Sequence, residues 1–226
     1  MKYKNIKEGI FISRPNRFIA YCETEGKKET CHVKNTGRCK ELLIPGVKVL
    51  LEKSENDKRK TPYDLVSVYK GERLINMDSM APNKVFGEFV SQGKFIEKVQ
   101  KIKPEYTYGN SRIDFYIETS EKKILAEVKG VTLEIDNAVY FPDAPTERGV
   151  KHIEELIKAK EEGFEVYIIF VTQMRDVRFF SPNRNTHPEF AEKLIEAKNK
   201  GVNIKCYECE VEIGEVNIIG EIPVIL

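Results

Sequence analysis

The sequence predicts a mixed α/β protein in which a small antiparallel β-barrel precedes an α/β domain. Six short strand-like runs separated by turn residues occupy the first 80 residues, at 6–12, 18–22, 29–33, 47–51, 65–69 and 74–77. Beyond residue 80, apolar residues recur at helical spacing, and helices then alternate with strands as in a β–α–β unit. The chain has 226 residues, of which 41% are hydrophobic, so it can form a substantial core.

The short strands of the first part, with Pro, Gly and Asn between them, are typical of a closed barrel. The OB-fold is the commonest nucleic-acid-binding barrel of this size. Two turns between the strands, at 13–18 and 34–40, place five cationic side chains on loops: Arg14, Arg17, Lys34, Arg38 and Lys40. Backbone phosphates are the natural partners of such loops. The neighbouring Phe18 and Tyr21 are more typical of a core or strand face than of a base-stacking platform.

Strand spacing changes to helix spacing near residues 78–82. We therefore expect a barrel domain over residues 1–80 and a second domain over residues 81–226. The first helix of the second domain ends near Gly93, and its apolar stripe consists of Val85, Phe86, Phe89 and Val90. Glu88 flanks that stripe.

Two short strands, around 113–117 and 124–128, follow this helix and are joined by a few polar residues. The pattern predicts an antiparallel hairpin with one apolar face. Asp114, Glu127 and Lys129 then lie on the opposite face. Two converging carboxylates offer the hard oxygen ligands that Mg²⁺ or Mn²⁺ prefers. Beside such a metal, a lysine can orient an attacking water while the metal stabilises charge on a phosphate.

This arrangement resembles the PD-(D/E)xK nuclease core, in which an Asp and a Glu-x-Lys on the next strand surround metal ions. The resemblance assigns catalysis to Asp114, Glu127 and Lys129, with both carboxylates as metal ligands and Glu88 as a possible further ligand. The Glu-x-Lys triplet recurs three times elsewhere in the chain. Only the copy at 127–129 ends an apolar strand paired with a strand that bears an Asp. Solvated strand residues are the alternative interpretation.

A further helix is expected from about Thr146, after a turn rich in Pro, Asp and Gly. Arg148 and His152 lie one turn apart on it, next to its apolar stripe, and both are candidates for phosphate contact. The apolar run at 165–171 is typical of a central strand, and a helix at 188–200 and a strand at 203–207 follow.

The formal net charge of +1 conceals an asymmetry along the chain. Residues 1–80 hold 17 Lys and Arg against 11 Asp and Glu, a net of +6, whereas residues 81–226 hold 20 against 25, a net of −5. A basic first part suits a polyanion, and an acidic second part suits a metal. Ordinary surface charge would give the same counts.

The five cysteines and the apolar pattern indicate a cytoplasmic protein. An odd number of cysteines without a secretory signal favours reduced thiols. No apolar run approaches 18 residues, so we expect no membrane association. Cys206 and Cys209 have ligand-like spacing, but in a strand they point to opposite faces, which disfavours a shared zinc or redox site.

Several separated motifs resemble the sugar fermentation stimulation protein A family. They are Asn-Thr-Gly-Arg at 35–38, Leu-Leu-Ile-Pro-Gly at 42–46, Tyr-Gly-Asn-Ser-Arg-Ile-Asp-Phe at 108–115, Glu-Val-Lys at 127–129 and Phe-Pro-Asp-Ala-Pro-Thr-Glu-Arg-Gly at 141–149. The resemblance spans nearly the whole chain. It implies an OB-fold joined to a nuclease-like domain, with DNA binding as the associated activity.

The residues and the resemblance together predict a DNA-binding protein with a Mg²⁺-dependent site able to hydrolyse phosphodiesters. We expect its DNA binding to be largely independent of sequence, because phosphate contacts carry no base information. The alternative is a non-enzymatic DNA-binding regulator of sugar-metabolism genes. A carbohydrate-modifying enzyme ranks last, because no paired acid and base for that chemistry is identifiable.

Overall fold

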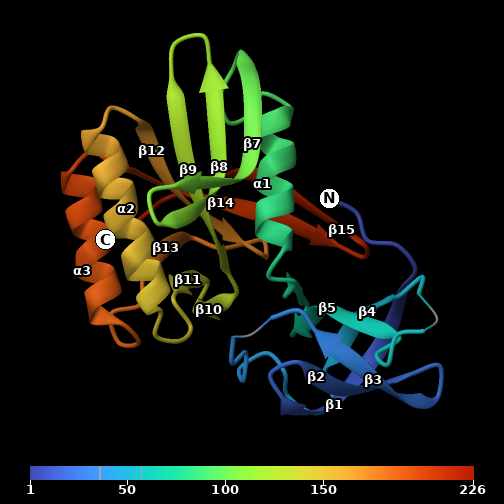
Figure 1. Cartoon of the computed structure of the whole chain (residues 1–226). Coiled ribbons are helices and arrows are strands. Elements are labelled where there is room, and N and C mark those ends of the chain that lie inside the picture. Colours follow the sequence, from blue (N-terminus) through green and yellow to red (C-terminus); the bar gives the residue numbers. More distant parts are fainter. Residues whose placement is uncertain (36, 57) are drawn as a thin grey trace.

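The computed structural model describes residues 1–35, 37–56 and 58–226, so Thr36 of the Asn-Thr-Gly-Arg motif lies outside the described residues. It contains an N-terminal β-barrel followed by a part built on a large sheet with helices on both sides (Figure 1). The predicted mixed α/β fold with an N-terminal barrel is therefore confirmed. Across the described ranges, no helix has the length and apolarity needed to cross a membrane.

The barrel is made by five strands, and a sixth extends it. The strands are β1 (Ile6–Asn16), β2 (Ile19–Thr24), β3 (Lys27–Val33), β4 (Lys48–Lys53), β5 (Tyr63–Lys70) and β6 (Arg73–Asn76). Antiparallel pairing runs through β3, β2, β1, β4 and β5, and a parallel pairing of β3 with β5 closes the ring. Strand β5 is buried along most of its length because β3, β4 and β6 all pair with it.

The second part is built on a six-stranded sheet in the order β15-β14-β12-β9-β8-β7. Its strands are β7 (Val99–Tyr108), β8 (Ser111–Thr119), β9 (Lys123–Val131), β12 (Glu165–Thr172), β14 (Asn203–Glu212) and β15 (Glu215–Ile222). Strand β12 is parallel to both β9 and β14, as expected for a central apolar strand reached through a helix. A separate three-stranded sheet contains β10 (Leu133–Ile135), β11 (Ala138–Phe141) and β13 (Phe179–Pro182).

Helices cover both faces of the large sheet (Figure 1). Helix α1 (Ala81–Ser91) packs against β9 and β15 on one face, whereas α2 (Glu147–Glu161) packs against β12 on the other, beside α3 (Pro188–Asn199). The side chain of Thr146 accepts a hydrogen bond from the backbone N–H of Gly149, which fixes the start of α2 at the expected place. The sheet between these helices is therefore buried on both faces.

The five cysteines are free and buried. Cys206 belongs to the apolar core on the α2 side of the sheet, and Cys209 belongs to the core on the α1 side. The two thiols therefore point to opposite faces of β14, as the strand pattern predicts.

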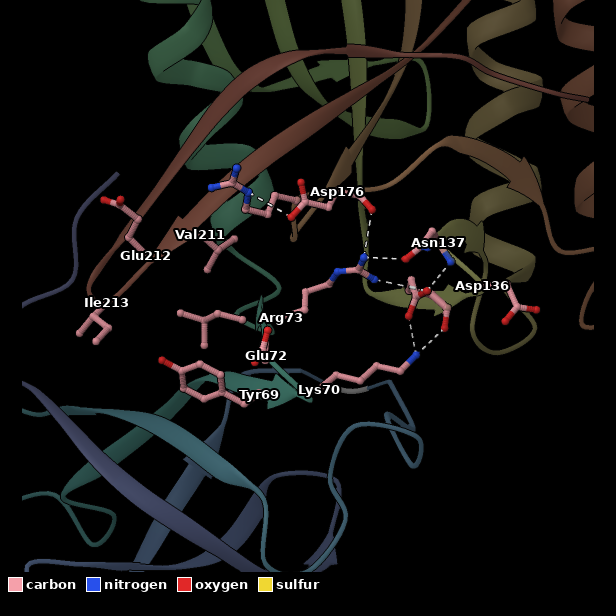
Figure 2. A pocket seen from close by; sticks show the side chains of 13 residues that line it. Tyr69, Lys70, Glu72, Arg73, Asp136, Asn137, Asp176, Val211, Glu212 and Ile213 are labelled. Atoms are coloured by element: carbon pink, nitrogen blue, oxygen red, sulfur yellow. Dashed lines mark hydrogen bonds and ion pairs between the residues drawn. The ribbon is translucent and has the colours of Figure 1, made fainter.

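The barrel joins the second part through apolar and ionic contacts. Each of the two apolar cores contains residues of both parts, such as Leu65 with Ile113 in one and Leu50 with Phe86 in the other. Lys70 and Arg73 from the barrel end contact the carboxylate of Glu134, which precedes the β10–β11 turn. These ion pairs line a hollow of about 970 Å³ between the two parts. Figure 2 shows Arg73 between Asn137 and Asp176, to both of which it donates hydrogen bonds.

Candidate functional site

Asp114 lies where strands β8 and β9 begin to separate. Regular pairing of these strands runs from Glu118 opposite Lys123 to Phe115 opposite Ala126. Beyond that point a side chain takes the place of a backbone carbonyl of β8: Asp114 Oδ2 accepts a hydrogen bond from the backbone N–H of Val128 at 2.8 Å. Its Oδ1 accepts a hydrogen bond from Asn83 Nδ2 of helix α1 at 2.9 Å. The carboxylate is thus held between the two strands and the start of α1.

Glu127, on β9, is the most buried acid of the site, with 2% of its surface exposed. Its Oε1 is contacted by Lys129 Nζ at 2.5 Å and by His152 Nδ1. Its Oε2 is buried and has no hydrogen-bond partner within residues 1–35, 37–56 and 58–226. Buried carboxylate oxygens are almost always bonded, so an unsatisfied one calls for an explanation.

The two carboxylates affect each other's protonation. Burial, and then the charge of Glu127, raise the pKa of Asp114 above its usual value. Burial alone would raise the pKa of Glu127 too, but Lys129 and His152 outweigh it and leave that pKa below its usual value. Glu127 therefore carries the negative charge most firmly, and a cation near both groups would relieve their repulsion.

These two acids fit a divalent cation. Both offer hard oxygen ligands, and Oε2 of Glu127 is a buried acceptor for which the described part of the chain supplies no donor. Lys129 is paired with Glu127 and only 17% of its side chain is exposed, so its ammonium lies beside the carboxylates. The structure thus brings together Asp114, Glu127 and Lys129, the three residues singled out by the hairpin motif.

Glu88 occupies a different position on helix α1. Its Oε2 pairs with the N-terminal ammonium of Met1 at 2.7 Å, and half of its side chain is exposed. It contacts neither Asp114 nor Glu127, so it is not part of the carboxylate pair.

Arg148 and His152, expected to contact phosphate, are differently placed. Arg148 is exposed, whereas His152 is 6% exposed and faces Glu127. Arg148 Nε donates to Nε2 of His152 at 3.3 Å, and Nδ1 of the same ring contacts Glu127. A chain of contacts thus leads from the surface to the buried carboxylate. The helical spacing of 148 and 152 was the one signal in the sequence for this pair.

The five cations predicted on the barrel loops divide into two groups. Arg14 lies in β1 and not on a loop, and it donates to four backbone carbonyls, those of Arg17, Asn35, Gly37 and Arg38. Lys34 lies within 4 Å of three carboxylates, those of Glu52, Asp64 and Asp78. A phosphate would have to displace these internal contacts.

The remaining three cations of the barrel loops, Arg17, Arg38 and Lys40, are exposed. They border a hollow of about 430 Å³ whose floor includes Phe11 and Leu43. The guanidinium of Arg17 lies 4.7 Å from the ring centre of Phe18, which is 44% exposed. This group is a cationic surface with apolar elements within it.

A further group with ligand-like composition, Glu147, His187 and Glu189, lies at the starts of α2 and α3. No local sequence pattern marks this group, because its residues come from the starts of two separate helices. The backbone N–H of Thr146 donates to Nδ1 of His187, so a neutral ring carries its proton on Nε2. That nitrogen faces both carboxylates at 3.8 Å and has no lone pair for a metal.

Comparison with known proteins covers both parts of the chain. Residues 12–77 match the profile described as the SfsA N-terminal OB domain, and residues 80–215 match the sugar fermentation stimulation protein RE domain. The sugar fermentation stimulation protein homologue of Ruminiclostridium cellulolyticum is 58% identical over 99% of both chains. The homologue of Clostridium beijerinckii is 56% identical over 100% of both chains.

A solved structure extends the comparison to three dimensions. Pyrococcus furiosus SfsA in complex with Ca²⁺ matches with a TM-score of 0.92 and 30% identity, covering 100% of this chain and 98% of that chain. Sequence and fold therefore agree over both the barrel and the large sheet, and the chain belongs to the sugar fermentation stimulation protein family.

Proposed function

We propose that this protein binds DNA and hydrolyses phosphodiesters at Asp114 and Glu127 with the help of Mg²⁺ or Mn²⁺. The observation that carries the proposal is the carboxylate of Glu127, which is buried and charged and has one oxygen without a partner in the described part of the chain. A fold that needed Glu127 only for stability would satisfy both oxygens. A metal-binding site requires one to stay free.

The site residues have separate roles in this proposal. Asp114 and Glu127 hold the metal, which when bound stabilises negative charge on the phosphate and lowers the pKa of a water. Lys129 orients the attacking water and supplies positive charge beside the phosphate. The Pyrococcus furiosus relative was solved in complex with Ca²⁺, a cation that takes the same oxygen ligands. That observation supports a cation site in this chain.

DNA is held through the exposed cations of the barrel, Arg17, Arg38 and Lys40. The segment that carries Arg38 and Lys40 reaches the second part, because Gly37 lies directly against the side chain of Asp143, in the turn before α2. Phosphate contacts of this kind give sequence-independent, salt-dependent binding. In this proposal, residues 1–80 bind DNA and residues 81–226 catalyse phosphodiester hydrolysis. The five free thiols suit the reducing cytoplasm.

A plasmid-nicking assay with Mg²⁺ or Mn²⁺ tests the proposal. The variant Lys129→Gln should cut at least about 10²-fold more slowly than the unaltered protein, while DNA affinity changes little. Lys123→Gln is the matched control, since Lys123 is exposed at the other end of β9 and should leave the rate unchanged. Binding of unrelated duplexes at low and moderate salt, measured on the same proteins, should differ with salt and not with sequence.

Two outcomes would contradict the proposed chemistry. If no form of DNA is cut by the unaltered protein, a non-enzymatic DNA-binding regulator of sugar-metabolism genes becomes the better description. If the unaltered protein and Lys129→Gln cut equally fast, the activity lies at another site or in a contaminant.

A further inference from the structure

His152 uses both of its ring nitrogens although it is almost completely buried. Nδ1 contacts Oε1 of Glu127, and Nε2 accepts the Nε–H of Arg148 at 3.3 Å. The side chain is 8% exposed, on the face of α2 that packs over the sheet. An imidazole ring is less favourable at a buried position than an apolar ring would be. The two hydrogen bonds of His152 therefore call for a functional explanation.

The contact with Arg148 determines where the ring proton lies. An arginine Nε–H can only donate, so Nε2 of His152 must present its lone pair. The proton therefore lies on Nδ1, and this N–H donates to Glu127 Oε1. In the opposite tautomer the ring proton would lie on Nε2, and Nδ1 would have no proton to donate to the carboxylate of Glu127.

Among the described residues, the donors that hold Glu127 consequently all contact one of its two oxygens. Lys129 and His152 both contact Oε1, and they come from β9 and from α2, so the carboxylate cannot rotate without losing both contacts. Oε2 is left as the open ligand atom. Residues that orient a ligand in this way typically change metal affinity by about 10- to 100-fold when removed.

We infer that His152 is a positioning residue that aims Oε2 of Glu127 at the metal, and that Arg148 fixes the tautomer required for this. The inference rests on the proposed function of Glu127 as a metal ligand. It replaces direct phosphate contact as the role of His152, and it leaves the outer N–H groups of Arg148 facing solvent, where a phosphate can reach them.

The bonding of His152 can be measured without any metal, by ¹⁵N NMR of protein labelled at histidine. The chain has three histidines, and the variant His152→Asn assigns the signal. We expect Nδ1 to carry the proton that is donated to Glu127, and the Nε2 signal to shift in Arg148→Ala. An Nδ1 that carries no proton in the unaltered protein would overturn the inference.

Calorimetry with Mn²⁺ tests the consequence for the metal. His152→Leu removes the donor and should weaken Mn²⁺ binding by about 10- to 100-fold. His152→Asn keeps an amide N–H near the position of Nδ1 and should restore most of the affinity, which a role in packing alone would not predict. Thermal unfolding of both variants verifies that each is folded.

Different results would contradict the positioning role of His152 and the metal-binding role of Glu127. Unchanged Mn²⁺ affinity in His152→Leu would overturn the positioning role while leaving the proposed function intact. An unaltered protein that binds no Mn²⁺ would overturn the proposed function, and the NMR measurement would still decide how His152 is bonded.

Discussion

Glu127 and Glu134 are both buried acids next to cations, yet they differ in how their oxygens are satisfied. Their exposed fractions are 2% and 6%, and both have a pKa below the usual value despite burial. Glu134 uses both oxygens: Oε2 contacts Lys70 at 2.5 Å, and Oε1 contacts the backbone N–H of Asn137 at 2.6 Å and Arg73 at 3.3 Å (Figure 2). In Glu127, both donors share one oxygen and the other has none within the described residues.

The difference separates a structural carboxylate from one kept available for a ligand. Glu134 connects the barrel to the second part, and complete bonding is what a permanent connection requires. Glu127 retains an unpaired acceptor, which costs stability unless a cation occupies it. Buried charge by itself therefore does not identify a functional group, whereas the bonding of each oxygen does.

The largest expected effect is on metal binding, where the two acids should behave oppositely. Glu127→Gln should weaken Mn²⁺ binding by at least about 10²-fold, or about 2.7 kcal/mol, because a neutral amide is a poor ligand for a hard cation. Glu134→Gln should leave the affinity unchanged. Titration calorimetry on both variants measures this, and equal affinities in the two variants would place the metal elsewhere.

The effects of the two substitutions on folding stability should have the reverse order, with Glu134→Gln the more destabilising. Glu134→Gln should lower the free energy of unfolding by about 2 kcal/mol, because Lys70 and Arg73 lose a charged acceptor that both of them share. Glu127→Gln should cost less than about 1 kcal/mol, because Oε1 remains an acceptor for Lys129 and His152 and the amide nitrogen replaces Oε2, which has no partner within the described residues. Urea unfolding of the metal-free proteins measures the free energy of unfolding of each variant. A larger loss in Glu127→Gln would show that Glu127 is the structural acid.

The smallest expected effect is the pH dependence of the stability that Glu134 contributes. Burial raises the pKa of Glu134, but Lys70, the Asn137 N–H and Arg73 outweigh it, so the folded pKa lies below the usual 4.5. A lowered folded pKa gives stability that is present above the unfolded value and is lost as the pH falls through the folded one. The difference in unfolding free energy between the unaltered protein and Glu134→Gln should therefore shrink on acidification below about pH 4.5. A difference that grows instead would contradict the ion pairing.

The strands, the helices and the acids of the hairpin follow from local pattern. Alternation marks β8 and β9, and the same alternation predicts that Asp114 and Glu127 share one face of the pair. Helical spacing and a cap at Thr146 locate α2. These features are encoded within a few residues, so one sequence suffices to predict them.

The partners of the charged side chains do not follow from local pattern. The sequence predicts that Arg14 and Lys34 lie in basic turns. Arg14 instead belongs to β1, and the partners of both cations are carbonyls and carboxylates that only the folded barrel brings near. Likewise, Glu88 meets the ammonium of Met1, 87 positions away. The role of Glu134 was missed for the same reason, because Lys70 is 64 positions distant.

The shared apolar cores have a practical consequence for dissecting this protein. Separate expression of either part would expose apolar side chains, since both parts contribute residues to each of the two cores. Apolar faces of that kind favour aggregation of truncated fragments. Fragments are therefore poor reagents for locating the DNA-binding surface, and point substitutions in the intact chain are the appropriate route.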